Sequence, residues 1–176
     1  VEDGAVVRRI SIGDDPELLI EHLREEYETF APDIIITSGG ISHGKYEVVR
    51  NAIAMAPSLG LPIPLSWFGH VSQQPGGPQG VNVLDFNGHR LPMISFPGNP
   101  VSTLISYVLM LRPYLRAGGP YGTPHEVASR MATLENAPRG VLVIDKPLTA
   151  PANKRQFLRG NLAMVESETG TYWVEL

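Results

Sequence analysis

A junction between a short strand and a long apolar helix constrains the fold of this chain more than any other feature. It spans residues 95–102 and has the sequence Ser-Phe-Pro-Gly-Asn-Pro-Val-Ser. Asn99 suits the N-cap because its side chain accepts a hydrogen bond from a first-turn amide, and Pro100 suits the first helical position, which needs no N–H. Gly98 lets a ligand approach the backbone closely, and Ser102 adds a hydroxyl. The free N–H groups and the helix dipole then predict an anion site, with a purely structural cap as the alternative.

A second glycine loop follows another strand pattern. Residues 33–36 are Asp-Ile-Ile-Ile, and this β-branched run predicts a strand buried on both faces. Apolar residues at helical spacing in residues 46–55 predict the helix that comes after the loop. Ligands bind at the carboxyl ends of strands in open α/β sheets, so the two loops predict one shared cleft, unless the glycines only form a turn. The first loop contributes these candidate ligand-binding residues: Thr37, Ser38, Gly39, Gly40, Ser42, His43 and Gly44.

Composition excludes several classes of function. The chain has 176 residues, 43% of them hydrophobic, and no cysteine, which excludes disulfides and thiolate metal sites and fits a reducing cytoplasm. The net charge of −4 gives no general attraction to nucleic acid, and no apolar run reaches the roughly 20 residues of a membrane helix. The five histidines lack metal-ligand spacing, and no nucleophile elbow or Walker-type phosphate loop occurs. We therefore expect a soluble protein that binds a small molecule, with neither nucleic acid nor membrane as a partner.

Strand and helix patterns alternate as far as residue 118. We expect a strand at residues 5–10 and a helix that opens at residues 15–17. Residues 81–86 and 89–96 form a predicted hairpin, since Asn-Gly at positions 87 and 88 is typical of two-residue turns. Pro92 would put part of the second hairpin strand at an edge or a bulge.

Two prolines frame the long helix, which starts at Pro100 and bends near Pro113. From Tyr121 onward we expect short strands at residues 126–133, 139–146, 155–161 and 172–176, and no helix. Such a pattern predicts a small β-barrel or sandwich. Lys154, Arg155 and Arg159 form a modest basic cluster, interpreted as a solvated face of this part. The abrupt start suggests a piece of a longer protein.

Together these motifs resemble the molybdopterin molybdotransferases, the family of MoeA and the E domain of gephyrin. The resemblance rests on Thr-Ser-Gly-Gly-Ile-Ser at positions 37–42 with Gly44 and Glu47, followed by Phe-Pro-Gly-Asn-Pro-Val-Ser at positions 96–102. It implies an α/β fold: a three-layer α/β/α MogA-like domain with a mostly parallel sheet over residues 1–119, lacking its N-terminal part. A small β-barrel-like domain, expected to lack its end, follows over residues 120–176. The resemblance also implies a cytoplasmic homodimer, with molybdopterin adenylyltransferase as a candidate partner.

In that family, molybdate is inserted into adenylylated molybdopterin and AMP is released, with Mg²⁺ assisting. The resemblance implies that Glu47 takes part in catalysis and binds the metal, and that Lys45, His70 and Gln74 also belong to the catalytic site. The second loop contributes these implied ligand-binding residues: Pro97, Gly98, Asn99, Pro100 and Ser102.

Three of these positions depart from the family pattern. Lys45 stands where the family has an acidic residue, and His70 and Gln74 stand where it has basic residues. Because fixed cations are missing, catalytic competence is open, and two alternatives stay beside the transferase. One is a molybdopterin adenylyltransferase, and the other is a non-catalytic pterin-binding or scaffold relative. The sequence does not separate molybdate from tungstate.

Overall fold

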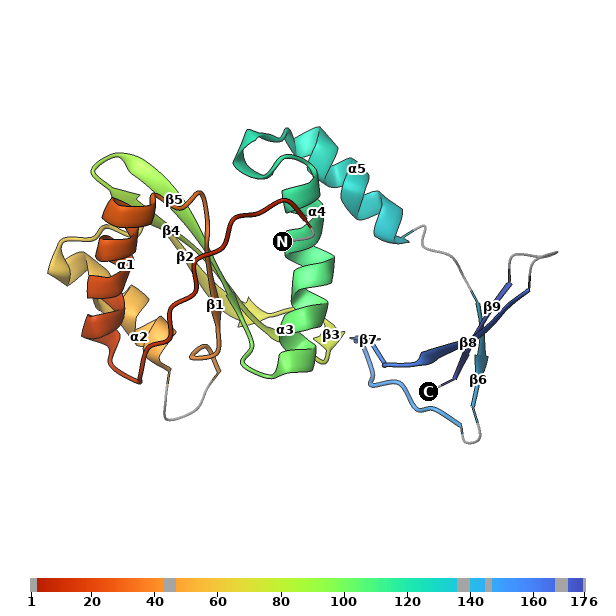
Figure 1. Ribbon diagram of the computed structural model, residues 1–176. Coiled ribbons are helices and arrows are strands. Elements are labelled where there is room, and N and C mark those ends of the chain that lie inside the picture. Colours follow the sequence, from red (N-terminus) through yellow and green to blue (C-terminus); the bar gives the residue numbers. More distant parts are fainter. Residues whose placement is uncertain (1–2, 43–46, 136–139, 145–146, 167–170, 176) are drawn as a thin grey trace.

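A mixed four-stranded sheet forms the centre of the larger part of the molecule. The computed structural model describes residues 3–42, 47–135, 140–144, 147–166 and 171–175. The strand order is β1-β5-β4-β2, as Figure 1 shows. The bounds are Ile35–Ser38 for β1, Leu65–His70 for β2, Pro78–Phe86 for β4 and His89–Phe96 for β5.

The expectation of a mostly parallel sheet is wrong for the described residues. Only β1 and β5 run parallel, whereas β5 pairs antiparallel with β4, and β4 pairs antiparallel with β2. The hairpin forces one antiparallel pair, and the short connection from β2 back to β4 forces the other, because parallel neighbours need a longer crossover. The strand β2 itself was not predicted, since its sequence lies within a Pro- and Gly-rich span.

Two helices cover one face of the sheet. α1 (Pro16–Phe30) begins at the predicted place, where the Asp15 side chain accepts hydrogen bonds from the first-turn N–H groups of Glu17 and Leu18. α2 (Val48–Met55) begins within the predicted helical span and continues as a 3-10 turn (Ala56–Leu59). The core between these helices and the sheet consists of Leu19, Ile20, Leu23, Ile41, Val49, Ala52, Ile53, Ala56, Leu61, Leu84, Phe86, Leu91 and Met93.

The β4–β5 hairpin forms as predicted. Asn87 and Gly88 both have positive φ, 54° and 92°, as a type I′ turn requires. β5 is an inner strand with regular register, but Pro92 precedes Met93, where the pairing with β1 begins. Pro92 therefore lies on a locally unpaired edge, where its missing N–H costs little.

β1 is the outer strand of the sheet, so its predicted burial on both faces is wrong. Its burial alternates along the strand, and Ile36 is 46% exposed. On the far face of the sheet, α3 (Pro100–Ser106) approaches β4 through Gln79, so helices flank both faces. A π-helical turn (Tyr107–Leu111) separates α3 from α4 (Arg112–Arg116), and Pro113 lies in the first turn of α4, where the bend stays a prediction.

The strand expected at residues 126–133 is wrong, because this segment belongs to α5 (Pro124–Glu135). Thr123 and Glu126 form a reciprocal capping box: the Thr123 N–H donates to Glu126 Oε2, and the Glu126 N–H donates to Thr123 Oγ1. Pro124 occupies the first helical turn, where its missing N–H is harmless. These local signals specify a helix, and the spacing of Val127 and Met131, four residues apart, agrees with it. The bonds from Thr123 also lower the pKa of Glu126.

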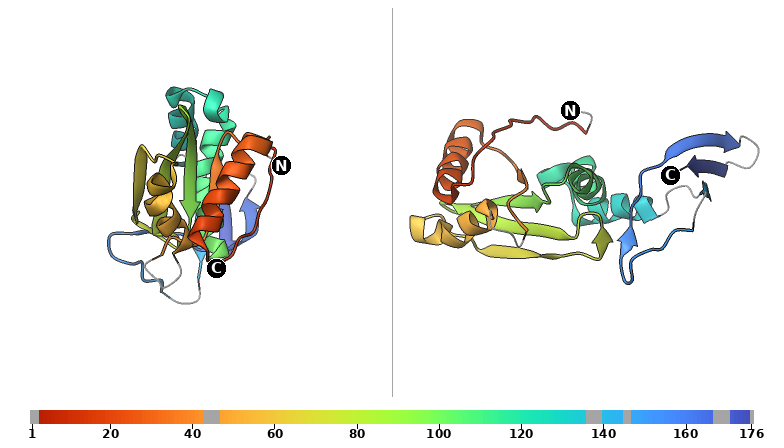
Figure 2. Two further views of the ribbon diagram at one scale, coloured as in Figure 1. Left: turned by 90° about the vertical axis from the view of Figure 1, so that its left-hand side faces the viewer. Right: turned by 90° about the horizontal axis from the view of Figure 1, so that it is seen from below.

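The last part of the chain forms short strands, but no closed barrel is found among its described residues. β6 (Gly140–Val143), β9 (Thr171–Glu175) and β8 (Asn161–Glu166) make a three-stranded sheet in that order. Figure 2 shows this sheet standing apart from the four-stranded one. A short parallel ladder between β3 (Gln73–Gln74) and β7 (Arg155–Gln156) joins the two parts.

The expected strand at residues 5–10 is also wrong. This segment runs without a ladder among the described residues, and Val6 and Val7 are 85% and 65% exposed. Ion pairs hold it: Arg8 binds Glu26, and the buried Asp3 carboxylate contacts Arg112 and Arg116. Figure 1 shows the segment crossing from α1 to α4. Every helix in the described residues is too short or too polar to cross a lipid bilayer.

The Asp3 anchor predicts a pH dependence. The hydrogen bond from Tyr107 and that from Arg116 lower the pKa of Asp3 from 3.8 to about 2. A lowered pKa means that the ionised carboxylate stabilises the folded chain above pH 4, and that this contribution is lost as the pH falls toward 2. Urea unfolding of the wild type and of Asp3→Asn should therefore give stabilities that differ at pH 5 and converge near pH 2. Asp14→Asn, which changes an exposed carboxylate, is the control, and an equal pH-dependent difference there would contradict the assignment.

Candidate functional site

The two glycine loops touch. β1 and β5 are parallel neighbours in register, Ser38 opposite Phe96, so the loops that follow them leave the same edge of the sheet. The Gly39 N–H donates to the Phe96 carbonyl oxygen at 2.9 Å. A Cβ added to Gly98 would lie 3.1 Å from the Gly39 Cα, closer than an ordinary contact, and one added to Gly39 would lie 3.7 Å from the Gly98 Cα. This confirms the prediction that the loops converge.

Hydroxyl groups fasten the first loop to α3. Thr103 Oγ1 donates to the Pro97 carbonyl oxygen at 2.6 Å and lies 3.2 Å from Ser38 Oγ. Ser38 Oγ also lies within 3.4 Å of the same carbonyl oxygen. Sequence reasoning missed Thr103, and the available signal was its position four residues after the N-cap, where a hydroxyl can bond back into the turn. The Ser38 hydroxyl therefore holds the loops together.

Asn99 forms the predicted N-cap of α3. Its Oδ1 accepts hydrogen bonds from the N–H groups of Val101 at 3.0 Å and Ser102 at 3.2 Å. Those two amides are consequently unavailable to a ligand. The N–H groups of Gly40, Gly98 and Asn99 make no hydrogen bond to another described residue, so they are the amides that can receive an anion.

Two hydroxyls from the predicted set are turned inward. Ser102 is 5% exposed and packs toward the turn at Gly76. Thr37 Oγ1 is buried without a partner among the described residues, as is Ser95 Oγ, and Thr37 pairs with Ser95 in the ladder. Ser42 is exposed, whereas His43, Gly44 and Lys45 lie outside the described residues.

Glu47 stands at the N-cap of α2 without capping it. Its Oε2 lies 3.7 Å from the Arg50 Nε, and its side chain is 16% exposed. No group of three acidic or histidine side chains suited to a metal occurs in the part of the chain that the structure describes. A magnesium site needs several oxygen ligands, and a single carboxylate paired with an arginine does not fit one held by the protein.

His70 and Gln74 lie at the same edge of the sheet as the loops, on the far side of β4 and β5. His70 ends β2 opposite Pro78, and Gln74 lies in β3. The Gln74 carbonyl oxygen accepts a hydrogen bond from the Phe157 N–H at 2.8 Å. Both side chains are exposed. The structure thus places the segment that carries His70 and Gln74 at the same edge of the sheet as the two loops.

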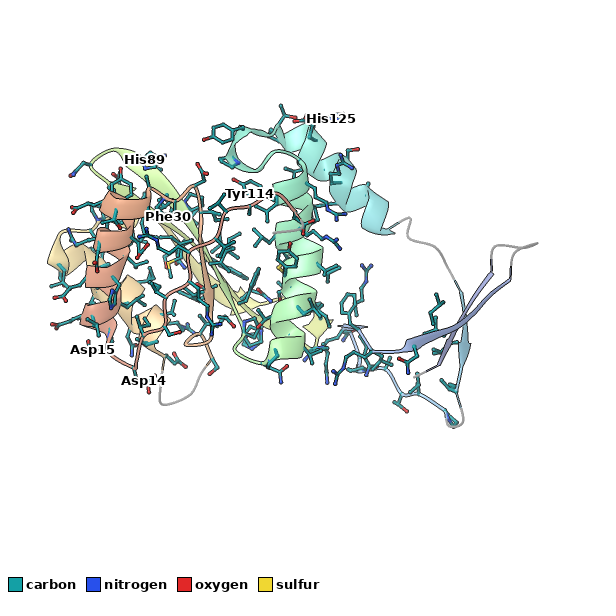
Figure 3. The ribbon with its side chains drawn as sticks, viewed as in Figure 1. Asp14, Asp15, Phe30, His89, Tyr114 and His125 are labelled. Carbon is teal, nitrogen blue, oxygen red and sulfur yellow. The ribbon has the colours of Figure 1, made fainter. Side chains whose placement is uncertain are left out.

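An open cavity of about 490 Å³ lies beside the loops, lined by Ser38, Gly98, Pro100 and Thr103 together with apolar side chains of β1 and α3. The opposite edge carries no predicted site residue in the described ranges. Figure 3 places His89 at that edge, at the β4–β5 turn, while Asp15 at the start of α1 marks the edge of the loops.

Comparison with known proteins assigns the family. The model of the probable molybdopterin binding domain matches residues 2–117, which contain both loops and the sheet. The chain belongs to this family. The family match therefore confirms the resemblance drawn from the two motifs.

Two relatives named as molybdopterin molybdenumtransferases match nearly the whole chain. Molybdopterin molybdenumtransferase 2 of Mycobacterium tuberculosis is 36% identical over 95% of the chain, and molybdenumtransferase 1 of the same species is 27% identical over 97%. Gephyrin of Dictyostelium discoideum is 32% identical over 51% of the chain. The chain spans 36% and 35% of the two molybdenumtransferases, and 13% of that gephyrin.

The loop contact predicts the effect of one methyl group. Gly98→Ala would push the Gly39 backbone away and should lower the free energy of unfolding by about 1–3 kcal/mol, the usual cost of overpacking. Gly13→Ala is the matched control, because a Cβ there meets nothing within 4 Å. Both substitutions restrict the unfolded chain equally, so their difference in urea unfolding isolates the contact. Equal stabilities of the two variants would show that the loops do not touch.

Proposed function

We propose that this chain binds the pterin nucleotide in a molybdopterin molybdenumtransferase, which inserts molybdate into adenylylated molybdopterin and releases AMP. The observation that carries the proposal is the contact between Gly39 and Gly98, with free N–H groups of Gly40, Gly98 and Asn99 around it. The names of the relatives from Mycobacterium tuberculosis support the same reaction.

The amides suit the pyrophosphate of the substrate. Backbone N–H groups near a helix start bind phosphate oxygens because they carry partial positive charge and need no reorganisation. α3 continues through the π-helical turn into α4, so its dipole is longer than seven residues alone would give. These groups hold the nucleotide in place, and they do not themselves transfer a proton.

The polar side chains at this edge supply less positive charge than the family pattern implies. His70 and Gln74 provide hydrogen bonds without a fixed positive charge, and Glu47 is paired with Arg50. We propose that His70 and Gln74 contact the anionic substrate from the side of β2. Magnesium neutralises phosphate charge when it is bound, and no step proposed for these residues depends on that ion.

Other proposals follow from the resemblance alone. The protein would act in the cytoplasm as a homodimer, receiving its substrate from a molybdopterin adenylyltransferase. The strands that follow α5 would belong to a separate β domain. These proposals concern the longer protein of which the relatives are examples.

A non-catalytic pterin-binding relative is the second candidate. The ion pair between Glu47 and Arg50 favours it, because it occupies the carboxylate that the catalytic proposal would use. Such a relative would bind the nucleotide through the same amides and release nothing.

Mixing the full-length natural protein with adenylylated molybdopterin, molybdate and magnesium should release AMP. Omitting molybdate should abolish this release. Chromatography of the nucleotides measures it, and ATP consumption in a parallel assay would indicate an adenylyltransferase instead. Tight nucleotide binding without AMP release would favour the non-catalytic relative. If the protein neither binds the nucleotide nor releases AMP, the proposed function is rejected.

A further inference from the structure

A buried glutamine joins the segment that carries His70 and Gln74 to the helix that follows the second loop. Gln79, on β4, is 3% exposed. Its Nε2 donates to the Gly76 carbonyl oxygen at 2.8 Å and to Ser106 Oγ at 2.7 Å. Ser106, on α3, is fully buried. One amide group therefore links a turn at the sheet edge to α3.

The turn itself is pressed against α3. A Cβ on Gly76 would lie 2.6 Å from Gln73 Nε2, 3.3 Å from Ser106 Oγ and 3.4 Å from the Ser102 carbonyl oxygen, and the φ of Gly76 is +97°. Only glycine combines this backbone conformation with so close an approach. The turn therefore packs closely against the helix.

Backbone hydrogen bonds from β7 hold the outer side of the segment at residues 71–77. The Arg155 N–H donates to the Ser72 carbonyl oxygen at 2.9 Å, and the Phe157 N–H donates to the Gln74 carbonyl oxygen at 2.8 Å. β7 therefore holds the segment from outside, while Gln79 fixes its distance from α3. Gln74 lies between these two supports.

A glutamine is unusual at a buried position such as 79 if its side chain only fills the core. The next residues on the same face of β4 are Val81 and Val83, so an apolar side chain would continue the pattern. The Oε1 of Gln79 is buried without a partner among the described residues. A buried amide that leaves one atom unsatisfied is costly, and such groups call for an explanation other than stability.

We propose that Gln79 is a positioning residue for the pterin-nucleotide site. It sets the place of His70 and Gln74 relative to the amides of Gly98 and Asn99, because α3 carries both its anchor and the second loop. This inference rests on the proposed function. An apolar residue at position 79 would leave the Gly76 carbonyl oxygen and the Ser106 hydroxyl without this donor, and the turn would separate from the helix.

Two variants test the proposal by steady-state AMP release. Gln79→Leu keeps the volume and removes the donor, and it should raise KM for adenylylated molybdopterin about tenfold, as expected for the loss of about one well-made hydrogen bond. kcat should change about twofold or less, because the substrate is bound less well and the reacting groups are unaltered. A role in folding alone would lower the amount of active enzyme and leave KM unchanged.

Ser106→Ala and the double variant sharpen the test. Ser106→Ala removes one of the two acceptors, so it should raise KM by a smaller factor than Gln79→Leu. The double variant should be no worse than Gln79→Leu alone, since both changes break the same hydrogen bond. Ser66→Ala is the matched control: it removes a 2.8 Å hydrogen bond to the buried Asn82 and leaves the segment at 71–77 untouched.

The outcomes separate the inference from the proposed function. If the wild type releases AMP and a folded Gln79→Leu keeps its KM, the inference is wrong and the proposed function stands. An equal rise in KM for Ser66→Ala would also overturn it. If Gln79→Leu does not fold, Ser106→Ala decides the question, and an unchanged KM there rejects the inference. A wild type that neither binds the nucleotide nor releases AMP rejects the proposed function, and the inference with it.

Discussion

The close approach of Gly39 to Gly98 is the constraint on which the rest of the site depends. Two parallel strands in register end side by side, and the backbones that follow them come within contact distance because neither residue has a side chain. The Gly39 hydrogen bond to Phe96 and the Thr103 hydroxyl then fix the two loops as one unit. Free amides from both loops are thereby gathered at one place, as recognition of a phosphate group requires.

The antiparallel strands of the mixed sheet bring a third segment to this site. Because β4 runs antiparallel to both of its neighbours, the segment at residues 71–77 returns to the edge where β1 and β5 end. A parallel strand at this position would have taken that connection to the opposite edge. Gln79 then ties the segment to Ser106 on α3, so three separate stretches of sequence meet at one helix.

Local signals in the sequence predicted much of this architecture. Asp15, Asn99 and the Asn87-Gly88 turn act within a few residues of themselves, and each forms the structure that its pattern indicates. The glycine loops were found for the same reason. Strand direction was not predictable, because pairing depends on partners far apart in sequence. The segment expected as a strand at residues 5–10 joins no ladder in the described residues, which shows the same dependence.

Other errors have identifiable causes. The capping box of Thr123 and Glu126 was readable, but the segment behind it was interpreted as one of a series of short strands. The burial of Gln79 and Ser106 has no signature in the sequence, since polar residues are expected at the surface. The inward orientation of Ser102 could not be read either, because it follows from the packing of the Gly76 turn against α3.

The most direct test of the account is the position of the bound nucleotide. Amide NMR spectra recorded while adenylylated molybdopterin is added should show that the signals of Gly40, Gly98 and Asn99 shift together with a single affinity. The signals of Gly60 and Gly88, which lie in turns away from the loops, should stay in place. Shifts confined to one loop, or centred on residues at another edge of the sheet, would contradict the conclusion that the two loops form one anion site.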